Sequence, residues 1–133
     1  MDKDARKELG YNNREWGQKA EALAAEYFLK EGYTIRERNW RAGRLEVDLI
    51  LEKDRTLIFV EVKARSSHGE DPALAVDRKK RQRTIRAADT YLRTQQVLYE
   101  YRFDIVTFIG TEKDYVFAHY EDAYLPEVNS SRL

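Results

Sequence analysis

Cysteine is absent from this chain of 133 residues, and proline and glycine are scarce, with two and six residues. The absence of cysteine excludes a disulfide scaffold, a zinc site built on thiolates and a cysteine nucleophile, and it fits a reducing compartment. Linker-like stretches of glycine, serine or proline and internal repeats are missing too. We expect a single domain over residues 1–133, with residues 1–13 and 127–133 loosely ordered.

Long apolar runs are also missing. The longest uninterrupted ones have only four residues, as in Ala22–Ala25 and Leu57–Val60. A helix that crosses a membrane needs about 20, and the polar N-terminal sequence has no apolar core of the kind found in a signal peptide. The sequence therefore predicts a soluble, cytoplasmic protein with no membrane contact.

Net charge is the third absence, because 24 lysines and arginines balance 24 aspartates and glutamates. A zero net charge argues at first against nucleic acid as a partner, since domains that bind it are usually basic. Along the chain, however, the charges are separated. Residues 78–93 hold seven basic side chains against one acid, residues 36–44 hold four against one, and residues 112–127 hold five acids against one lysine.

The one-signed basic segment at residues 78–93 favours an anionic partner over the ordinary alternative, which is a solvated helix face. Basic side chains in the first turns of a helix can follow phosphate groups. The residues predicted to contact nucleic acid are Arg41, Arg44, Lys79, Lys80, Arg81 and Arg83.

The hydrophobic pattern predicts a helix, about three strands, a second helix and two more strands. The first expected elements are a helix over residues 14–31 that ends at Gly32, a strand over 33–38, a basic turn over 39–43, a strand over 45–52, a turn over 53–56 and a strand over 57–64. A loop over 68–71 follows, and then a helix begun by Asp71 or Asp77, with Ile85, Ala88, Tyr91 and Leu92 buried. The last two strands are expected over 101–109 and 115–120, joined by a loop at 110–114. This order is typical of an α/β domain with a mixed central sheet whose faces are covered by helices.

Charged side chains interrupt two of the predicted strands. In the first, four odd-numbered leucines and valines form one apolar face, and Glu46 and Asp48 fall on the other. In the second, Glu61 and Lys63 share a face. If residues 53–56 close a hairpin, the numbers of paired residues sum to 109, which places Asp48 opposite Glu61 and Glu46 opposite Lys63.

The expected proximity of Asp48 and Glu61 calls for compensation. Two carboxylates about 4 Å apart repel by roughly 4 kcal/mol at an effective dielectric constant of about 20. A shared proton, the ammonium of Lys63 or a divalent cation would compensate, and such oxygen ligands suit Mg²⁺ or Mn²⁺. The alternative is a structural network in which Lys63 neutralises Glu46 and Glu61, and the residues alone leave both open.

The order Asp48, then Glu61-Val62-Lys63 thirteen residues later, resembles the motif of the PD-(D/E)xK restriction-endonuclease-like superfamily. More narrowly, four segments resemble the bacterial YraN-type family, also called UPF0102. They are LEVDLI (Leu45–Ile50), IFVEVKAR (Ile58–Arg65), AVDRKKRQRTIRAADTYL (Ala75–Leu92) and YRFDIV (Tyr101–Val106). The resemblance runs from about residue 16 to residue 124 and implies a restriction-endonuclease-like fold.

The resemblance implies hydrolysis of phosphodiester bonds assisted by a divalent metal. Asp48 and Glu61 are expected to hold Mg²⁺ or Mn²⁺, with the carbonyl of Val62 as a third protein oxygen. Lys63 is expected to orient or activate the attacking water and to stabilise charge in the transition state. Glu46 is expected to act through an outer water molecule or to hold Lys63 in place.

Other positions also match the family. Glu21 and Glu46 match two of its acids, although the glycine before each is replaced, by Ala20 and Leu45. Glu21 is either a metal ligand, the neighbour of a metal-bound water or a solvated helix acid. Three further residues match family positions, namely Lys80, Arg102 and Asp104.

The sequence thus predicts a small metal-dependent endonuclease that acts on DNA, including branched or otherwise structured DNA, with a homodimer as one way to cut two strands. A second hypothesis is a non-catalytic module of the same fold that binds nucleic acid or serves as a scaffold. A third is a structural α/β domain that binds a protein. The intact Asp48, Glu61 and Lys63 favour the first hypothesis, although fold alone does not establish function.

The histidines are interpreted as structural or surface residues, and the strand aromatics as core residues. His68 and His119 are isolated and lack the spacing of metal ligands. The aromatic residues that alternate along the last two strands are expected in the core rather than on a platform for base stacking. They are Tyr101, Phe103, Tyr115 and Phe117.

Overall fold

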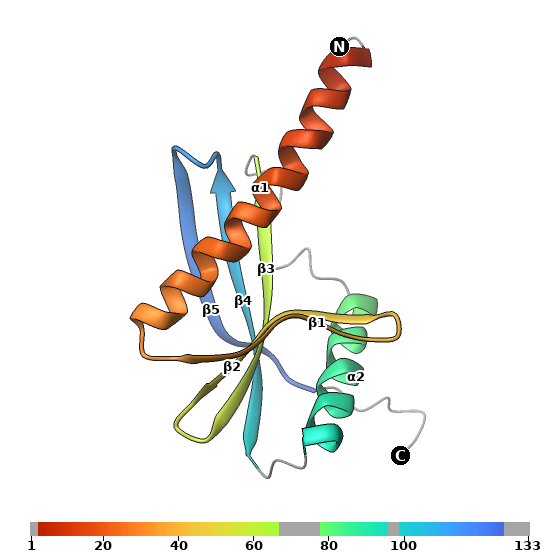
Figure 1. Cartoon of the computed structure of the whole chain (residues 1–133), viewed down its shortest axis with the longest axis vertical. Helices are drawn as coiled ribbons and strands as arrows, with labels where there is room; N and C mark the ends of the chain where they lie inside the picture. The colour runs from red at the N-terminus through yellow and green to blue at the C-terminus, as the bar shows by residue number, and fades with distance from the viewer. Residues whose placement is uncertain (1–2, 67–77, 96–98, 127–133) are drawn as a thin grey trace.

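The computed structural model describes residues 3–66, 78–95 and 99–126, which form a five-stranded sheet and two helices (Figure 1). In chain order the elements are α1 (Lys3–Lys30), β1 (Thr34–Ala42), β2 (Leu45–Lys53), β3 (Thr56–Arg65), α2 (Arg78–Gln95), β4 (Glu100–Gly110) and β5 (Tyr115–Tyr124). The predicted order of helices and strands is confirmed. Within the described ranges, no helix is long and apolar enough to cross a bilayer.

The sheet has the strand order β1-β2-β3-β4-β5. β3 and β4 run parallel, and the other neighbouring strands run antiparallel. A parallel pair needs a crossover connection, and α2 lies in the one between β3 and β4. The mixed sheet with its two helices confirms the predicted α/β class and is compatible with a restriction-endonuclease-like fold.

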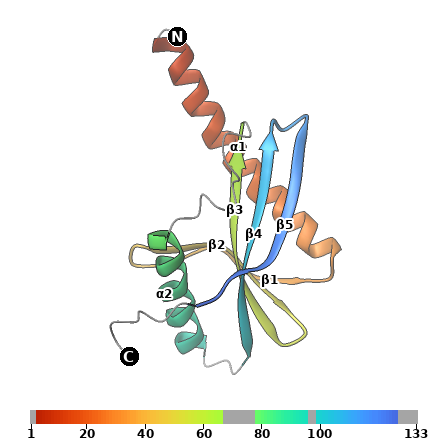
Figure 2. The same ribbon diagram turned by 180° about the vertical axis from the view of Figure 1, so that it is seen from behind.

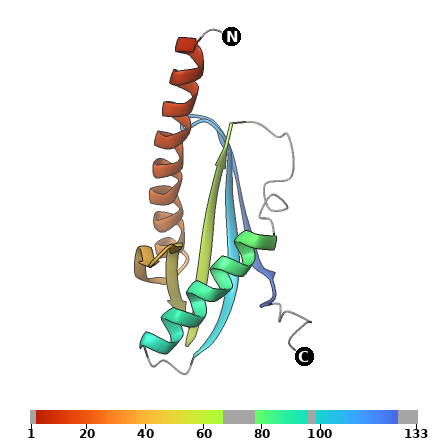
Figure 3. The ribbon, with the colours of Figure 1, turned by 90° about the vertical axis from the view of Figure 1, so that its right-hand side faces the viewer.

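Each helix covers one face of the sheet. α1 passes in front of the strands in Figure 1 and behind them in Figure 2, and its core includes Phe28, Val60 and Phe108. On the opposite face, α2 contributes Tyr91 to a second core that includes Phe59. Successive residues of β3 therefore enter different cores, as expected for a strand buried on both faces. Figure 3 shows α1 along one side of the strands and α2 crossing them at a steep angle.

α1 ends where the sequence predicts. Gly32 has a φ of 88°, its N–H donates to the Leu29 carbonyl at 3.1 Å, and the Tyr33 N–H donates to the Phe28 carbonyl at 2.9 Å. These two bonds are those of a Schellman motif, in which glycine adopts the left-handed conformation. The start differs, because the helix begins at Lys3 rather than at residue 14.

The β2–β3 hairpin has the predicted register. The pairs run from Lys53 opposite Thr56 to Leu49 opposite Val60, and the two numbers of each pair sum to 109. Asp54 and Arg55 form the turn, with φ values of 51° and 61°. Two successive left-handed residues are the mark of a type I′ turn, whose twist matches that of the flanking strands.

The β1–β2 hairpin differs from the prediction of a strand over residues 33–38 and a basic turn over 39–43. β1 continues to Ala42, and Gly43, with a φ of 60°, begins the turn. Asn39 has a positive φ of 49°, but it lies inside the strand. The longer strand allows Trp40 to pack against the core on the α2 side.

α2 presents a slightly different face from the predicted one. Thr84, Ala87, Ala88 and Tyr91 are buried, whereas Ile85 and Leu92 pack at the margin of the core. The sequence pattern missed Thr84 because a threonine is not counted as apolar. The proposed caps Asp71 and Asp77, the loop at residues 68–71 and His68 lie outside the described residues.

The side chains of β2 do not alternate strictly between the two faces of the sheet, and the change of face falls at the candidate site residue Asp48. Leu49 and Leu51 pack in the core on the α1 side, whereas Val47 packs with α2. The prediction of a single apolar face is therefore wrong. The change falls at Asp48, beside the left-handed Asn39 of β1 and beyond the last pair of the β2–β3 ladder, so the start of β2 can turn toward α2.

Candidate functional site

A pocket of about 110 Å³ lies where the start of β2 leaves β3, beside the first turns of α2. Its lining residues are Glu46, Val47, Asp48, Val60, Glu61, Lys80 and Thr84. Three carboxylates and one ammonium group therefore meet around a small space. Glu61 is buried and Asp48 is partly buried, whereas Glu46 and Lys80 reach the surface. The two less exposed carboxylates need compensation because a buried charge is costly without a partner.

Asp48 lies where the β2–β3 ladder ends. Beyond the pair of Leu49 and Val60, the Val62 N–H donates to Asp48 Oδ2 at 2.8 Å. Asp48 and Glu61 thus reach the same pocket, but a bond from backbone to side chain replaces the expected strand pairing. Burial raises the pKa of Asp48 to about 6. The Val62 N–H opposes this shift, and the negative charges of Glu21 and Glu61 add to it.

Glu61 is the most deeply buried carboxylate of the pocket, with a side chain 6% exposed. Its Oε1 lies 3.4 Å from Lys63 Nζ and forms a second ion pair with Lys80. Its Oε2 is buried and accepts no hydrogen bond from the part of the chain that the structure describes. A buried carboxylate oxygen without a partner is costly, so a further ligand would be most favourable at this atom.

The two lysines at Glu61 have different surroundings. Lys63 stands on β3, and burial lowers its pKa although Glu61 opposes the shift. Lys80 projects from α2. Burial acts to lower its pKa too, but the hydrogen bond and the negative charge of Glu61 outweigh that effect and raise it. Lys63 is therefore the ammonium group that gives up its proton more readily.

Glu46 does not lie opposite Lys63, so that part of the predicted register is wrong. β2 has already left β3 at this point and pairs with β1 instead. Glu46 Oε1 lies 3.6 Å from a guanidinium nitrogen of Arg41, across the β1–β2 hairpin. Glu46 therefore borders the pocket without contributing to the charge balance at Lys63.

Glu21 approaches the site from α1. Burial raises its pKa, a side-chain hydrogen bond with Asn39 reduces that shift, and the charge of Glu46 adds to it. Glu21 is not among the residues that line the pocket, but its charge contributes to the raised pKa of Asp48. It lies near the site as an electrostatic neighbour.

The pocket suits a hard divalent cation. Within the described ranges, no three histidine, aspartate or glutamate side chains are grouped as metal ligands. The side chains offer Asp48 and Glu61, and Mg²⁺ commonly keeps several water molecules beside one or two carboxylates. Since Glu61 Oε2 is buried without a partner, the residues present fit such an ion. The Val62 carbonyl stays a predicted third ligand.

Comparison with known proteins establishes the family. Residues 20–108 match the sequence model described as "Uncharacterised protein family UPF0102". The chain belongs to this family. The UPF0102 protein of Bacteroides thetaiotaomicron is 41% identical over 115 residues, 86% of this chain and 95% of that protein. The one from Parabacteroides distasonis is 42% identical over 112 residues, 81% and 90% of the two chains. The one from Chlorobium chlorochromatii is 46% identical over 93 residues, 69% and 72%.

The UPF0102 match covers the pocket and its surroundings. Asp48, Glu61 and Lys63 all lie within residues 20–108, as do Glu21 and Lys80. Helix α2 therefore belongs to the family region together with the strands that carry the acids. The family description itself names no activity.

The six basic residues predicted to bind nucleic acid have different surroundings in this UPF0102 protein. Lys80 lines the pocket, and the Arg81 guanidinium lies 5.3 Å from the centre of the Tyr124 ring. The remaining four are exposed on the β1–β2 hairpin and on α2, and they are Arg41, Arg44, Lys79 and Arg83. Their contact with nucleic acid stays a prediction.

Thr84 is a pocket residue that the sequence did not single out. Its hydroxyl donates to the Lys80 carbonyl at 3.1 Å. Burial raises the pKa of Tyr124 to about 12. The position of Thr84 four residues after Lys80, on the same helical face, is the one signal that could have identified it.

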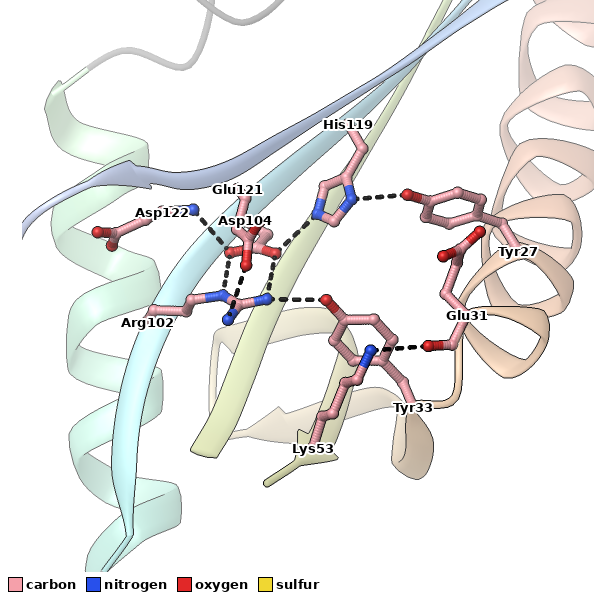
Figure 4. A network of polar contacts seen from close by, with 9 residues as sticks. All are labelled: Tyr27, Glu31, Tyr33, Lys53, Arg102, Asp104, His119, Glu121 and Asp122. Atoms are coloured by element: carbon pink, nitrogen blue, oxygen red, sulfur yellow. Dashed lines mark hydrogen bonds and ion pairs between the residues drawn. The ribbon is translucent and has the colours of Figure 1, made fainter. Parts of the chain in front are cut away.

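A second polar cluster, also unpredicted, lies on the α1 side of the sheet (Figure 4). Its centre is Asp104 of β4, whose side chain is inaccessible to solvent. His119 Nε2 lies 2.7 Å from Asp104 Oδ2, and Tyr27 Oη lies 2.9 Å from His119 Nδ1. Because a carboxylate only accepts, His119 carries a proton on Nε2. The structural role predicted for His119 is thus observed.

The backbone explains why Asp104 is needed. β4 and β5 change register between Phe103 and Ile105, and Asp122, with a φ of 52°, lies in the extra segment of β5. The Asp122 N–H donates to Asp104 Oδ1 at 3.0 Å. The carboxylate thus accepts a bond from an N–H that the irregular ladder would leave unpaired.

Arg102 completes the cluster by pairing with Asp104 at 3.0 Å and donating to the Tyr33 hydroxyl at 2.9 Å. Burial acts to raise the pKa of Asp104, but hydrogen bonds from His119, Arg102 and the Asp122 N–H outweigh it and hold the pKa below its usual value. The cluster joins β4 and β5 to the end of α1.

The strand aromatics only partly follow the prediction. Phe103 is fully buried, and Phe117 packs at the edge of the α1-side core. Tyr101 and Tyr115 are 43% and 36% exposed, so their assignment to the core is wrong. Both lie at or near strand ends, and their rings still contact buried aromatic neighbours, which are Phe103 for Tyr101 and Phe108 and Trp16 for Tyr115.

Proposed function

We propose that this protein is a metal-dependent nuclease that hydrolyses phosphodiester bonds in nucleic acid, with DNA, including branched DNA, as the expected substrate. The observation that carries the proposal is the buried, unpartnered Oε2 of Glu61 in the pocket that also holds Asp48. Two carboxylates that disfavour each other's charge are the arrangement that a bound cation stabilises. Mg²⁺ or Mn²⁺ is the cofactor expected for these oxygen ligands.

Asp48 and Glu61 would hold the ion. When bound, a metal of this kind polarises a phosphate oxygen and lowers the pKa of a coordinated water. Lys63, which is buried beside Glu61, would supply a fixed positive charge for the phosphate as negative charge develops on it. Burial lowers the pKa of Lys63, so this ammonium is also better suited than a solvated lysine to exchange a proton with water.

The exposed basic residues support an anionic polymer as the substrate. Arg41 and Arg44 lie on the β1–β2 hairpin, and Lys79 and Arg83 lie on α2. Both elements also contribute to the pocket wall, through Glu46 and Lys80 among others. Contacts from these cations to phosphates on either side of the pocket would position the nucleic-acid strand without recognising its base sequence.

One observation favours a second candidate, a non-catalytic module that binds nucleic acid. Lys63 and Lys80 both pair with Glu61, so the site is partly neutralised without any metal. A structural ion network of this kind would keep the fold and the basic surface but would not catalyse hydrolysis.

The test is to incubate the purified protein with plasmid, linear and four-way-junction DNA, and with RNA, in Mg²⁺, Mn²⁺ or EDTA. Cleavage is expected with either metal and not in EDTA. It is expected to be lost in Asp48→Asn and Lys63→Ala, and to be strongly reduced in Lys63→Arg because a guanidinium cannot replace a compact ammonium. Asp54→Asn, the same change in an exposed turn, is the matched control and should cleave normally.

Binding without cleavage, unchanged in the Asp48 and Lys63 variants, would leave the non-catalytic module as the function. Absence of both binding and cleavage would contradict both candidates. Calorimetric titration of Mn²⁺ into the wild type and Asp48→Asn tests the metal site independently of any substrate.

A further inference from the structure

Two ammonium groups share one carboxylate oxygen in the pocket. Lys63 Nζ lies 3.4 Å from Glu61 Oε1, and Lys80 forms an ion pair with the same atom. The Lys63 side chain is 7% exposed, whereas that of Lys80 is 50% exposed. Lys80 is therefore the one of the two that can move away from Glu61 into solvent.

The two lysines also differ in how the fold holds them. Lys63 stands on β3, which pairs with neighbouring strands along its length, whereas Lys80 reaches Glu61 from the first turn of α2. Its long side chain can change rotamer while the helix stays in place. The contact between Lys80 and Glu61 can thus break without any change in the sheet.

A divalent cation would compete with Lys80 for Glu61. Asp48, Glu61 and Lys80 line the same pocket of about 110 Å³, so an ion held by the two carboxylates would lie beside the Lys80 ammonium. Like charges at such short range, in a site partly shielded from water, repel each other strongly. Glu61 therefore cannot bind the metal and the Lys80 ammonium at the same time without weakening one of the two interactions.

We propose that Lys80 is an exchangeable counter-ion of the metal site: its ammonium neutralises Glu61 while no metal is bound, and an incoming divalent cation displaces it. The inference rests on the proposed function because it takes the metal site as given. It assigns to Lys80 a role that differs from the permanent contact of Lys63 and from direct binding of nucleic acid. The role also explains why a basic residue of α2 points at a buried acid rather than outward.

The experiment is a calorimetric titration of Mn²⁺ into the full-length wild type, Lys80→Met, Lys80→Arg and Lys79→Met. Removal of the competing charge should make Lys80→Met bind Mn²⁺ about tenfold more tightly, a factor at the low end of typical coupling between two binding events. Lys80→Arg keeps a charge that can pair with Glu61 and should stay close to the wild type. Lys79→Met removes the same charge from the neighbouring exposed position and should also stay close.

A thermal melt gives a second readout, because Lys80→Met should lower the stability of the metal-free protein although it tightens Mn²⁺ binding. In EDTA, Lys80→Met should melt below the wild type because Glu61 has lost one counter-ion. On addition of Mn²⁺, its midpoint should rise by more than that of the wild type. A residue that merely supports the fold would lower the midpoint under both conditions and would not tighten metal binding.

Unchanged or weaker Mn²⁺ binding by Lys80→Met, with a native circular dichroism spectrum, would overturn the exchange and leave the metal site standing. If Lys80→Met does not fold, Lys80→Gln is titrated in its place, with the same expected tightening. Failure of the wild type to bind Mn²⁺, or equal binding by Asp48→Asn, would overturn the metal site and the exchange together.

Discussion

Asp48 is a carboxylate whose ionisation is less favourable in the folded protein than in the unfolded chain. Its pKa rises from 3.8 to about 6 through burial and the charges of Glu21 and Glu61. The native state therefore binds the proton more tightly than the unfolded state, and stability falls as the pH rises from about 4 to about 6. The ionised carboxylate of Asp48 therefore lowers the stability of the protein in the absence of a cation, as is common for residues of functional sites.

Asp48→Asn is expected to stabilise the metal-free protein. Asparagine keeps an acceptor for the Val62 N–H, and removal of a shift of about two pKa units should raise the free energy of unfolding at pH 7.5 by about 3 kcal/mol. Urea titrations in EDTA at several pH values measure this, and the fall in stability between pH 4 and 6 should shrink in the variant. In Mn²⁺ the order should reverse, because only the wild type gains binding energy. A variant less stable than the wild type in EDTA contradicts the prediction.

Asp104 has the opposite dependence on pH, because its pKa lies below the usual value. It stabilises the protein above the pKa of an unfolded aspartate, about 3.8, and this contribution is lost as the pH falls through the lower native value. Asp104→Asn leaves Arg102 and the cluster without their anion and should cost about 3 kcal/mol at pH 7. Urea midpoints from pH 7 down to pH 3 should show this difference shrinking in acid.

Tyr33→Phe is the control for that series. It removes only the hydroxyl that accepts from Arg102 and should cost about 1 kcal/mol at every pH. A cost of Asp104→Asn that does not change with pH would show that lost packing, and not the carboxylate charge, dominates.

Single residues show where sequence reasoning reaches its limit. The placement of Glu61 beside Lys63 follows from the two-residue period of a strand, and both side chains are buried together. The contact between Lys80 and Glu61 depends on how α2 is rotated and where it begins relative to β3. No local pattern specifies those two quantities, so Lys80 was predicted only as a contact for nucleic acid.

The hairpins show the same limit at the scale of elements. The register of β2 and β3 was predictable because a two-residue turn at Asp54 and Arg55 leaves one pairing that buries the right faces. The bend of β2 at Asp48 was not predictable, because it lies beside a left-handed Asn39 in the neighbouring strand and beyond the last β2–β3 pair, which are features of the folded sheet. Asparagine tolerates that conformation, but its identity alone does not require it.

Two glycines in different elements should respond oppositely to alanine. At Gly110, which has a φ of 129°, a Cβ would lie 2.3 Å from the Asp114 carbonyl oxygen. Gly110→Ala should therefore cost about 3 kcal/mol in the β4–β5 hairpin. At Gly17 in α1 a Cβ meets nothing within 4 Å, so Gly17→Ala should add about 1 kcal/mol through helix propensity. Urea unfolding of both variants checks this, and destabilisation by Gly17→Ala would contradict the described packing of α1.

At the scale of the whole molecule, the zero net charge conceals a separation of charges. Four exposed basic residues, Arg41, Arg44, Lys79 and Arg83, lie on α2 and the β1–β2 hairpin, on the same side of the molecule, away from the hairpin between β4 and β5 (Figure 1). The acids of residues 112–122 lie on β5 and the turn before it. A neutral molecule of this kind can present a positive region to phosphates while its far side disfavours them.

The dependence of DNA binding on salt measures that positive region. If Arg41, Arg44, Lys79 and Arg83 each displace one counter-ion from duplex DNA, the plot of log K against log salt should have a slope of about −4. Fluorescence anisotropy in EDTA, which prevents metal-dependent cleavage, gives the slope directly. Lys79→Ala and Arg44→Ala should each reduce its magnitude by about 1. Lys113→Ala removes an equivalent exposed charge in the distant β4–β5 turn and should leave it unchanged; an equal effect of all three variants would mean that overall charge, and not this surface, binds the DNA.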